Sequence, residues 1–139
     1  MDWAKLSETS HYQTALAVKQ SLDEQNIADA TQGIEELIEA LGRSDKRALR
    51  SQLTRLMAHI LKWKIQPQQR SRSWLATITD ARIEIADLLE DELSLKNSIP
   101  ELWPKCFNAA KRLARDETGI EPAISMLSEK QVFEEEYSL

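Results

Sequence analysis

The sequence predicts an all-α protein, an antiparallel bundle of four to five helices with a short C-terminal helix. Apolar residues recur with the 3.6-residue period of a helix over long stretches. The 139 residues include only three glycines and four prolines, fewer than a turn-rich β-sandwich or barrel needs. The connections between the periodic stretches are short, which makes neighbouring helices antiparallel. The length fits a single helical domain over residues 1–139.

The first two helices are expected at about residues 7–25 and 28–41. Their apolar stripes are Ala15, Val18 and Leu22 in the first and Ile34, Leu37, Ile38 and Leu41 in the second. Gly42 follows at a position that favours a left-handed C-terminal cap. We therefore expect the second helix to end there and a third to begin after it, with Ser44 as its N-cap.

The third and fourth helices are expected to form a hairpin. The third carries the most regular stripe of the chain, Leu49, Leu53, Leu56, Met57, Ile60 and Leu61. The fourth starts near Ser71 or Ser73, and its stripe is Trp74, Ile78, Ala81, Ile85 and Leu88. Pro67 blocks continuation of a helix, so the chain should reverse direction near Gln66 to Arg70.

A fifth helix is expected over about residues 99–118, ended by Gly119. Pro104 would sit in its second turn, so the helix either begins there or bends there. Ser128 and Gln131 have the spacing of a capping box, which predicts a short last helix. Residues 120–139 should form a tail that packs on the bundle or extends from it.

Several classes of protein are disfavoured by what the sequence lacks. The single cysteine, Cys106, rules out an internal disulfide and reads as a small buried hydrophobe. No run of about 18 apolar residues and no signal-peptide core is present, so we expect a cytoplasmic protein without a membrane partner. No glycine-rich phosphate loop, nucleophile elbow, Cys-x-x-Cys pair or zinc spacing occurs. We therefore expect no metal and no cofactor.

Charge is strongly polarised along the chain. Residues 43–82 contain ten basic and two acidic residues, net +8, between two acidic segments. A basic hairpin carrying Trp63 and Trp74 could hold phosphates and stack bases. The net charge of −5 is opposite to that of most nucleic-acid binders. Pairing with acidic residues of neighbouring helices is the simpler interpretation, and nucleic acid is an alternative partner that we do not favour.

Three polar residues fall on helix faces that should be apolar. At 100° per residue, Arg82 lies inside the stripe of the fourth helix, Glu117 lies among the apolar residues of the fifth, and His59 flanks the face of the third. A buried charge needs a partner, and Glu117 is a candidate carboxylate for Arg82. Either these residues form structural pairs, or they line a polar pocket made of His59, Lys62, Trp63, Trp74, Arg82 and Glu117.

A series of residues resembles a known family. It comprises the stretch Gly42-Arg43-Ser44-Asp45-Lys46-Arg47-Ala48-Leu49, then His59-Ile60-Leu61-Lys62-Trp63, Gln66-Pro67, Arg70, Ser73-Trp74, Thr77-Ile78, Arg82, Ser94-Leu95 and Glu117-Thr118-Gly119. Over about residues 28–120 the chain is similar to the bacterial, largely cyanobacterial, family called domain of unknown function 29. The resemblance implies an all-helical fold and no established activity.

The function that we expect is therefore that of a non-enzymatic helical module, which binds another protein or associates with itself. The first alternative is a nucleic-acid-associated protein that uses the basic 43–82 hairpin. The second is an enzyme built around His59, Arg82 and Glu117, for which no recognised catalytic spacing is present.

Overall fold

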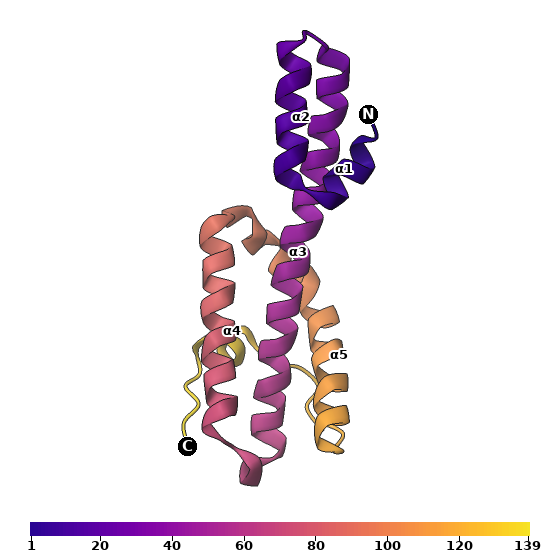
Figure 1. Ribbon diagram of the computed structural model, residues 1–139. Coiled ribbons are helices and arrows are strands. Elements are labelled where there is room, and N and C mark those ends of the chain that lie inside the picture. The colour runs from indigo at the N-terminus through magenta and orange to yellow at the C-terminus, as the bar shows by residue number, and fades with distance from the viewer. The chain divides into compact units, whose positions relative to one another are not determined.

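The computed structural model describes residues 1–139 and contains helices and no β-strand, which confirms the all-α prediction (Figure 1). The α-helices are α1 (Trp3–Thr9), α2 (His11–Asp23), α3 (Ile27–Ile65), α4 (Arg72–Asp91) and α5 (Ile99–Thr118). Two 3-10 turns, η1 (Pro67–Gln69) and η2 (Leu93–Ser98), and a π-turn, η3 (Lys130–Glu134), complete the set. None of these helices has the length and apolar character that crossing a membrane requires.

The contacts of the chain divide it into two compact units, which we call the N-terminal unit (residues 1–46) and the C-terminal unit (residues 47–139). Helix α3 contributes its first part to the N-terminal unit and the remainder to the C-terminal unit. The organisation of the chain as one domain over residues 1–139 stays a prediction.

In the N-terminal unit, the prediction of a single first helix over about residues 7–25 is wrong. The segment forms α1 and α2, with Ser10 between them in an extended conformation. The Ser10 hydroxyl accepts a hydrogen bond from the Gln13 amide at 3.1 Å, and the Asp2 carboxylate caps α1 in the same way through the Lys5 amide. Short polar side chains favour such caps over helix interiors, so Ser10 begins a second helix.

The predicted helix break at Gly42 is also wrong, because Gly42 and Ser44 both lie inside α3. An internal glycine costs a helix only about 1 kcal/mol. Helix ends, by contrast, leave backbone groups without helical partners, and no proline follows Gly42 to force an end. Continuing the helix is therefore the lower-energy solution.

The interior of the N-terminal unit is small. Trp3 is buried against Val18 and Ala30, and its indole Nε1 donates to Asp29 Oδ1 at 2.8 Å. The hydroxyl of Ser21 donates to Asp29 Oδ2 at 3.0 Å. These two hydrogen bonds lower the pKa of Asp29, and they tie α1 and α2 to the first turn of α3.

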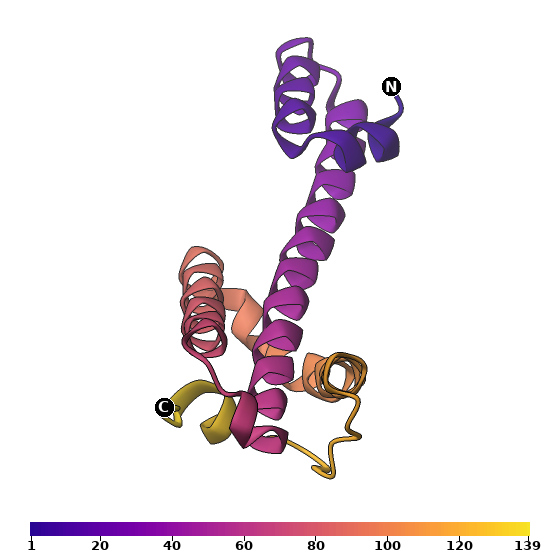
Figure 2. The same ribbon diagram turned by 60° about the horizontal axis from the view of Figure 1, so that its bottom comes forward.

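The C-terminal unit is built on the predicted hairpin. Figures 1 and 2 both show α4 and α5 on either side of the second part of α3. All six residues of the predicted α3 stripe are fully buried. The chain reverses through η1 at Pro67, and the Ser71 hydroxyl caps α4. Contacts of Arg55 with Asp80 and of Lys62 with Trp74 confirm that α3 and α4 are antiparallel.

Helix α5 begins at Ile99 and continues through Pro104, and Gly119 ends it with a φ of 73°, as predicted. The predicted capping box is also present. The Ser128 amide donates to Gln131 Oε1 at 2.8 Å, and the Gln131 amide donates back to Ser128 Oγ at 3.1 Å. Leu127 is fully buried in this segment, and its carbonyl accepts from Trp103 Nε1, so the tail packs on the C-terminal unit.

Candidate functional site

The structure separates the six predicted site residues into two groups, both within the C-terminal unit. One group surrounds Lys62 and contains Trp74, Glu117 and the nearby His59. The other contains Arg82 and Trp63, which contact the C-terminal segment after Leu127. The single polar pocket envisaged from the sequence therefore consists of two distinct neighbourhoods.

Lys62 is the centre of the first group, and it is only 6% exposed. Its Nζ lies 2.6 Å from Glu117 Oε2 and 5.0 Å from the centroid of the Trp74 ring. A buried ammonium is tolerated when a carboxylate and an aromatic face both compensate it. The partner of Glu117 is thus Lys62 of α3, and not Arg82, for which Glu117 was one candidate carboxylate.

His59 lies one turn before Lys62 on α3 and is half-buried. Its Nδ1 is 3.1 Å from the backbone carbonyl of Arg55. Because a carbonyl can only accept, Nδ1 carries the proton and Nε2 of the neutral ring is an open acceptor. Burial lowers the pKa of His59, and the positive charges of Lys62 and Arg55 lower it further, against the opposing effects of the Arg55 carbonyl and Glu117. The imidazole is therefore neutral at pH 7.

His59 and Glu117 line the same cavity, which has a volume of about 430 Å³ and lies between α3 and α5. The α3 wall includes Arg50 and Arg55, and the α5 wall includes Lys105. Sequence reasoning did not single out Arg50 or Lys105. The four-residue spacing from Lys105 to Glu117 on one face of α5 was visible in the sequence, but nothing in it indicated which face of α3 lies opposite.

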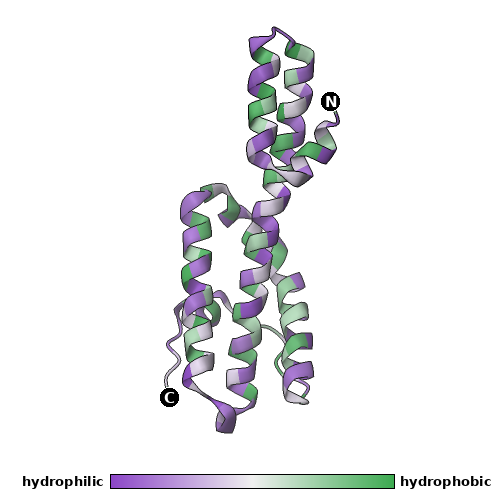
Figure 3. Cartoon of the chain, in the orientation of Figure 1, coloured by the Kyte–Doolittle hydropathy of each residue, from purple (hydrophilic) through white to green (hydrophobic).

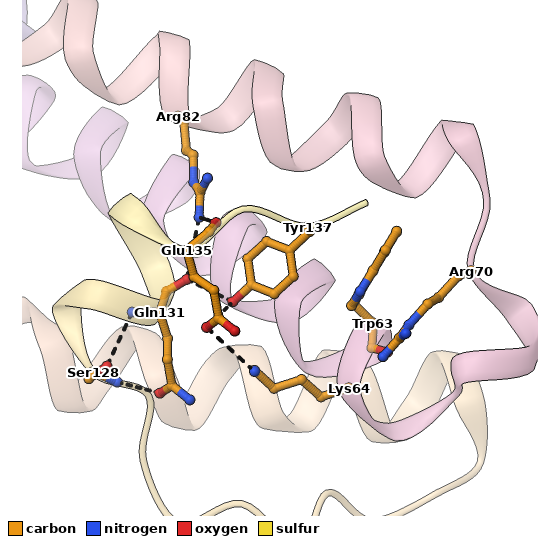
Figure 4. A network of polar contacts seen from close by, with 8 residues as sticks. All are labelled: Trp63, Lys64, Arg70, Arg82, Ser128, Gln131, Glu135 and Tyr137. Carbon is orange, nitrogen blue, oxygen red and sulfur yellow. Dashed lines mark hydrogen bonds and ion pairs between the residues drawn. The ribbon is translucent and has the colours of Figure 1, made fainter. Parts of the chain in front are cut away.

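Arg82 has a different role, which Figure 4 shows. Its guanidinium donates to three backbone carbonyls: Nε to Val132 at 2.8 Å, and Nη2 to Glu135 at 2.8 Å and to Gln131 at 3.3 Å. The inward lean that the helical wheel predicted is present, but the expected carboxylate partner is wrong. The carbonyls at the end of a short helical turn lack helical partners, and the fork of an arginine can satisfy several of them.

Trp63 and Tyr137 extend this contact network (Figure 4). Trp63 is buried, and its ring meets Tyr137 edge-on with centroids 6.1 Å apart. The Tyr137 hydroxyl donates to the Gln131 carbonyl at 2.8 Å. Burial, together with the neighbouring Glu135, raises the pKa of Tyr137 and keeps its hydroxyl protonated. We call this set of contacts the tail clamp, since it attaches the C-terminal segment to α3 and α4.

Several basic residues of the hairpin lie within ion-pair distance of a carboxylate. Arg43 lies near Glu39, Arg55 near Asp80, Lys62 near Glu117, and Lys64 near Glu135, each within 4.0 Å. The C-terminal unit as a whole contains fourteen basic and fourteen acidic residues and is neutral. Three of these carboxylates, Glu39, Glu117 and Glu135, lie outside residues 43–82 and compensate part of the net charge of +8. Nucleic-acid binding stays a prediction that we do not favour.

The remaining candidate chemistry is limited. No group of three or more His, Cys, Asp or Glu side chains is arranged to hold a metal ion. Cys106 is buried, as predicted, with its Sγ 3.7 Å from the Arg50 carbonyl. Burial raises the pKa of this thiol, and a thiol that stays protonated is a poor nucleophile.

Comparisons with known proteins identify a family and nothing finer. No curated protein and no solved structure matches the chain. The model of one family, described as domain of unknown function DUF29, matches residues 8–138. This match extends beyond the 28–120 stretch on which the sequence resemblance rested, and it includes both α2 and the tail clamp. The chain belongs to the DUF29 family.

Proposed function

We propose that this protein is a non-enzymatic interaction module whose N-terminal unit binds a basic amphipathic helix of another protein. The observation that carries this proposal is that small residues fill the interior of this unit while large apolar side chains lie on its surface. The buried positions of the N-terminal unit are occupied mostly by small residues, Ser7, Thr14, Ser21, Ala30, Gly33 and Ala40. Eight of the fourteen exposed large apolar side chains of the protein lie in these 46 residues.

Four of these eight exposed apolar residues lie on one face of α3. Ile34, Ile38 and Leu41 are 41%, 64% and 41% exposed, and their spacing places them on one face. Ile27, which is also exposed, lies two turns before Ile34 on the same face. Figure 3 shows hydrophobic segments along α2 and the first part of α3. Exposed apolar surface of this kind marks protein-binding sites, and anchors at this spacing are typical of helix-on-helix recognition.

Charge selects the type of partner. The N-terminal unit has four basic and nine acidic residues, net −5, which is the whole net charge of the chain. Glu35 and Glu39 directly follow Ile34 and Ile38. A second copy of the unit or an anionic lipid surface would bring like charges together, whereas a basic helix would complement them and be attracted at long range.

The test uses a synthetic amphipathic peptide of about 18 residues, or five helical turns, with leucine on one face and lysine on the other. Fluorescence anisotropy measures its binding to the full chain, in comparison with a peptide that has glutamate in place of lysine. We expect the lysine peptide to bind at least about ten-fold more tightly, a difference of about 1.4 kcal/mol. We also expect its affinity to fall with salt, because the attraction is screened.

Two variants locate the binding site. The double variant Ile34→Ser, Ile38→Ser should lose binding, whereas Ile83→Ser, which changes an isoleucine of similar exposure in the C-terminal unit, should keep it. Equal binding of the two peptides, or unchanged binding by the double variant, would refute the proposal. Sedimentation that reveals a dimer in the native chain and a monomer in the double variant would replace it with self-association.

A further inference from the structure

The cavity between α3 and α5 is a second place where the structure points to a ligand, and it is independent of the proposed N-terminal surface. Its α3 wall is a single helix face, residues 50, 51, 54, 55, 58 and 59, and its α5 wall is the face with residues 105, 109, 113 and 117. Its volume of about 430 Å³ lies within the range of small-molecule sites.

The charge in this cavity is positive and incompletely compensated. The structure gives neither the Arg50 guanidinium nor the Lys105 ammonium an ion-pair partner. Arg55 is bound to Asp80, through one Nη only. Glu117 is the only acidic residue that lines the cavity. Its carboxylate is already paired with Lys62, which is not part of the lining. Two cations on facing helices are therefore left for an incoming anion.

The neutral groups around the cavity fit the same interpretation. Ser51 and Thr54 bring hydroxyls to the α3 wall between the two arginines. His59 lies further along that wall, with Nδ1 held by the Arg55 carbonyl and Nε2 facing no protein partner. Ala58, Ala109 and Leu113 supply an apolar lining. The cavity thus combines cationic and hydroxyl donors with a compact apolar wall.

We propose that this cavity binds a small phosphate monoester, with the phosphoryl group between Arg50 and Lys105 and the organic body against the apolar wall. A phosphate monoester carries up to two negative charges near pH 7, which matches two unpaired cations, whereas a carboxylate would leave one of them uncompensated. Arginine binds phosphoryl oxygens through its fork and lysine as a point charge. The volume exceeds what a phosphate ion alone would fill, so an organic body is part of the ligand.

The test uses three probes, phenyl phosphate, inorganic phosphate and benzoate, titrated into the isotope-labelled full chain and followed by NMR chemical shifts. We expect phenyl phosphate to bind most tightly, with benzoate at least about ten-fold weaker. The shifted amides should lie in residues 50–59 and 105–117. Equal affinity for benzoate and phenyl phosphate would overturn the choice of phosphate, and shifts spread over unrelated surfaces would overturn the site.

Variants separate a built site from general attraction to positive charge. Arg50→Gln and Lys105→Gln should each weaken phenyl phosphate binding by about ten-fold or more, since each removes one ligand of the phosphoryl group. Arg112→Gln is the matched control, because Arg112 is an exposed cation of the same helix α5 that does not line the cavity. Equal weakening by the control would refute the proposal. Lys105 is exposed, so its variant keeps the test valid even if Arg50→Gln does not fold.

Discussion

From the contacts of the tail clamp we predict that Arg82→Ala detaches the C-terminal segment from α4. The change removes three charge-assisted hydrogen bonds. The Gln131 carbonyl keeps its bond from Tyr137, and the bond to Glu135 is exposed, so water can replace it. The carbonyl of the fully buried Val132 is left without a donor.

The loss of stability follows from this accounting. A hydrogen bond with one charged partner contributes about 1.5–3 kcal/mol when it is shielded from water. The hydrogen bond to the Val132 carbonyl should contribute its full free energy, and the bonds to the Glu135 and Gln131 carbonyls only part of theirs. We therefore expect the unfolding free energy of the C-terminal unit to fall by about 2–3 kcal/mol. The cost is lower than that of removing one member of a buried ion pair, because Arg82→Ala leaves no buried charge without its partner.

The assay is urea unfolding followed by tryptophan fluorescence in a Trp3→Phe background, so that the signal comes from Trp63, Trp74 and Trp103 of the C-terminal unit. Limited proteolysis of the last residues provides a second readout. Arg72→Ala is the control, since Arg72 is an exposed arginine at the start of the same helix. A stability change within about 0.5 kcal/mol of that control, with the tail still resistant to protease, would show that Arg82 does not hold the segment.

Two further predictions concern a tight contact and a titration. Gly33→Ala would place a Cβ 2.7 Å from atoms of Trp3 and Val18, so thermal unfolding followed by circular dichroism should show a loss of about 1–2 kcal/mol despite the gain in helix propensity. Gly42→Ala meets no atom within 4 Å and should stabilise the protein by about 0.5–1 kcal/mol; the opposite order would refute the packing argument. His59 has a lowered pKa in the folded state, so below about pH 6.5 the unfolded chain takes up a proton that the folded chain resists, and stability falls as the pH decreases. Urea titrations of His59→Gln at several pH values should show a weaker decline, and parallel curves for variant and native chain would contradict the assignment.

Much of the fold could be predicted from the sequence because its causes are local. The period of the apolar residues from Leu49 to Leu61 places a helix and its buried face. The turn at Pro67, the end of α5 at Gly119 and the capping box at Ser128 each depend on residues within one or two turns. The break at Ser10 and the continuity through Gly42 were missed because they are balances of about 1 kcal/mol between a cap and a further helical turn.

The site could not be predicted to the same extent, because side-chain partners depend on the register between helices that are distant in sequence. The helical wheel predicted that Arg82 and Glu117 lean inward, which holds for Arg82 but not for Glu117, whose side chain is 52% exposed. It could not indicate that Arg82 meets backbone carbonyls of the tail, or that Glu117 meets Lys62. The sequence by itself determined the helices and their buried faces. Only the tertiary structure decided which charges compensate one another and which, like Arg50 and Lys105 in the cavity beside His59, have no ion-pair partner.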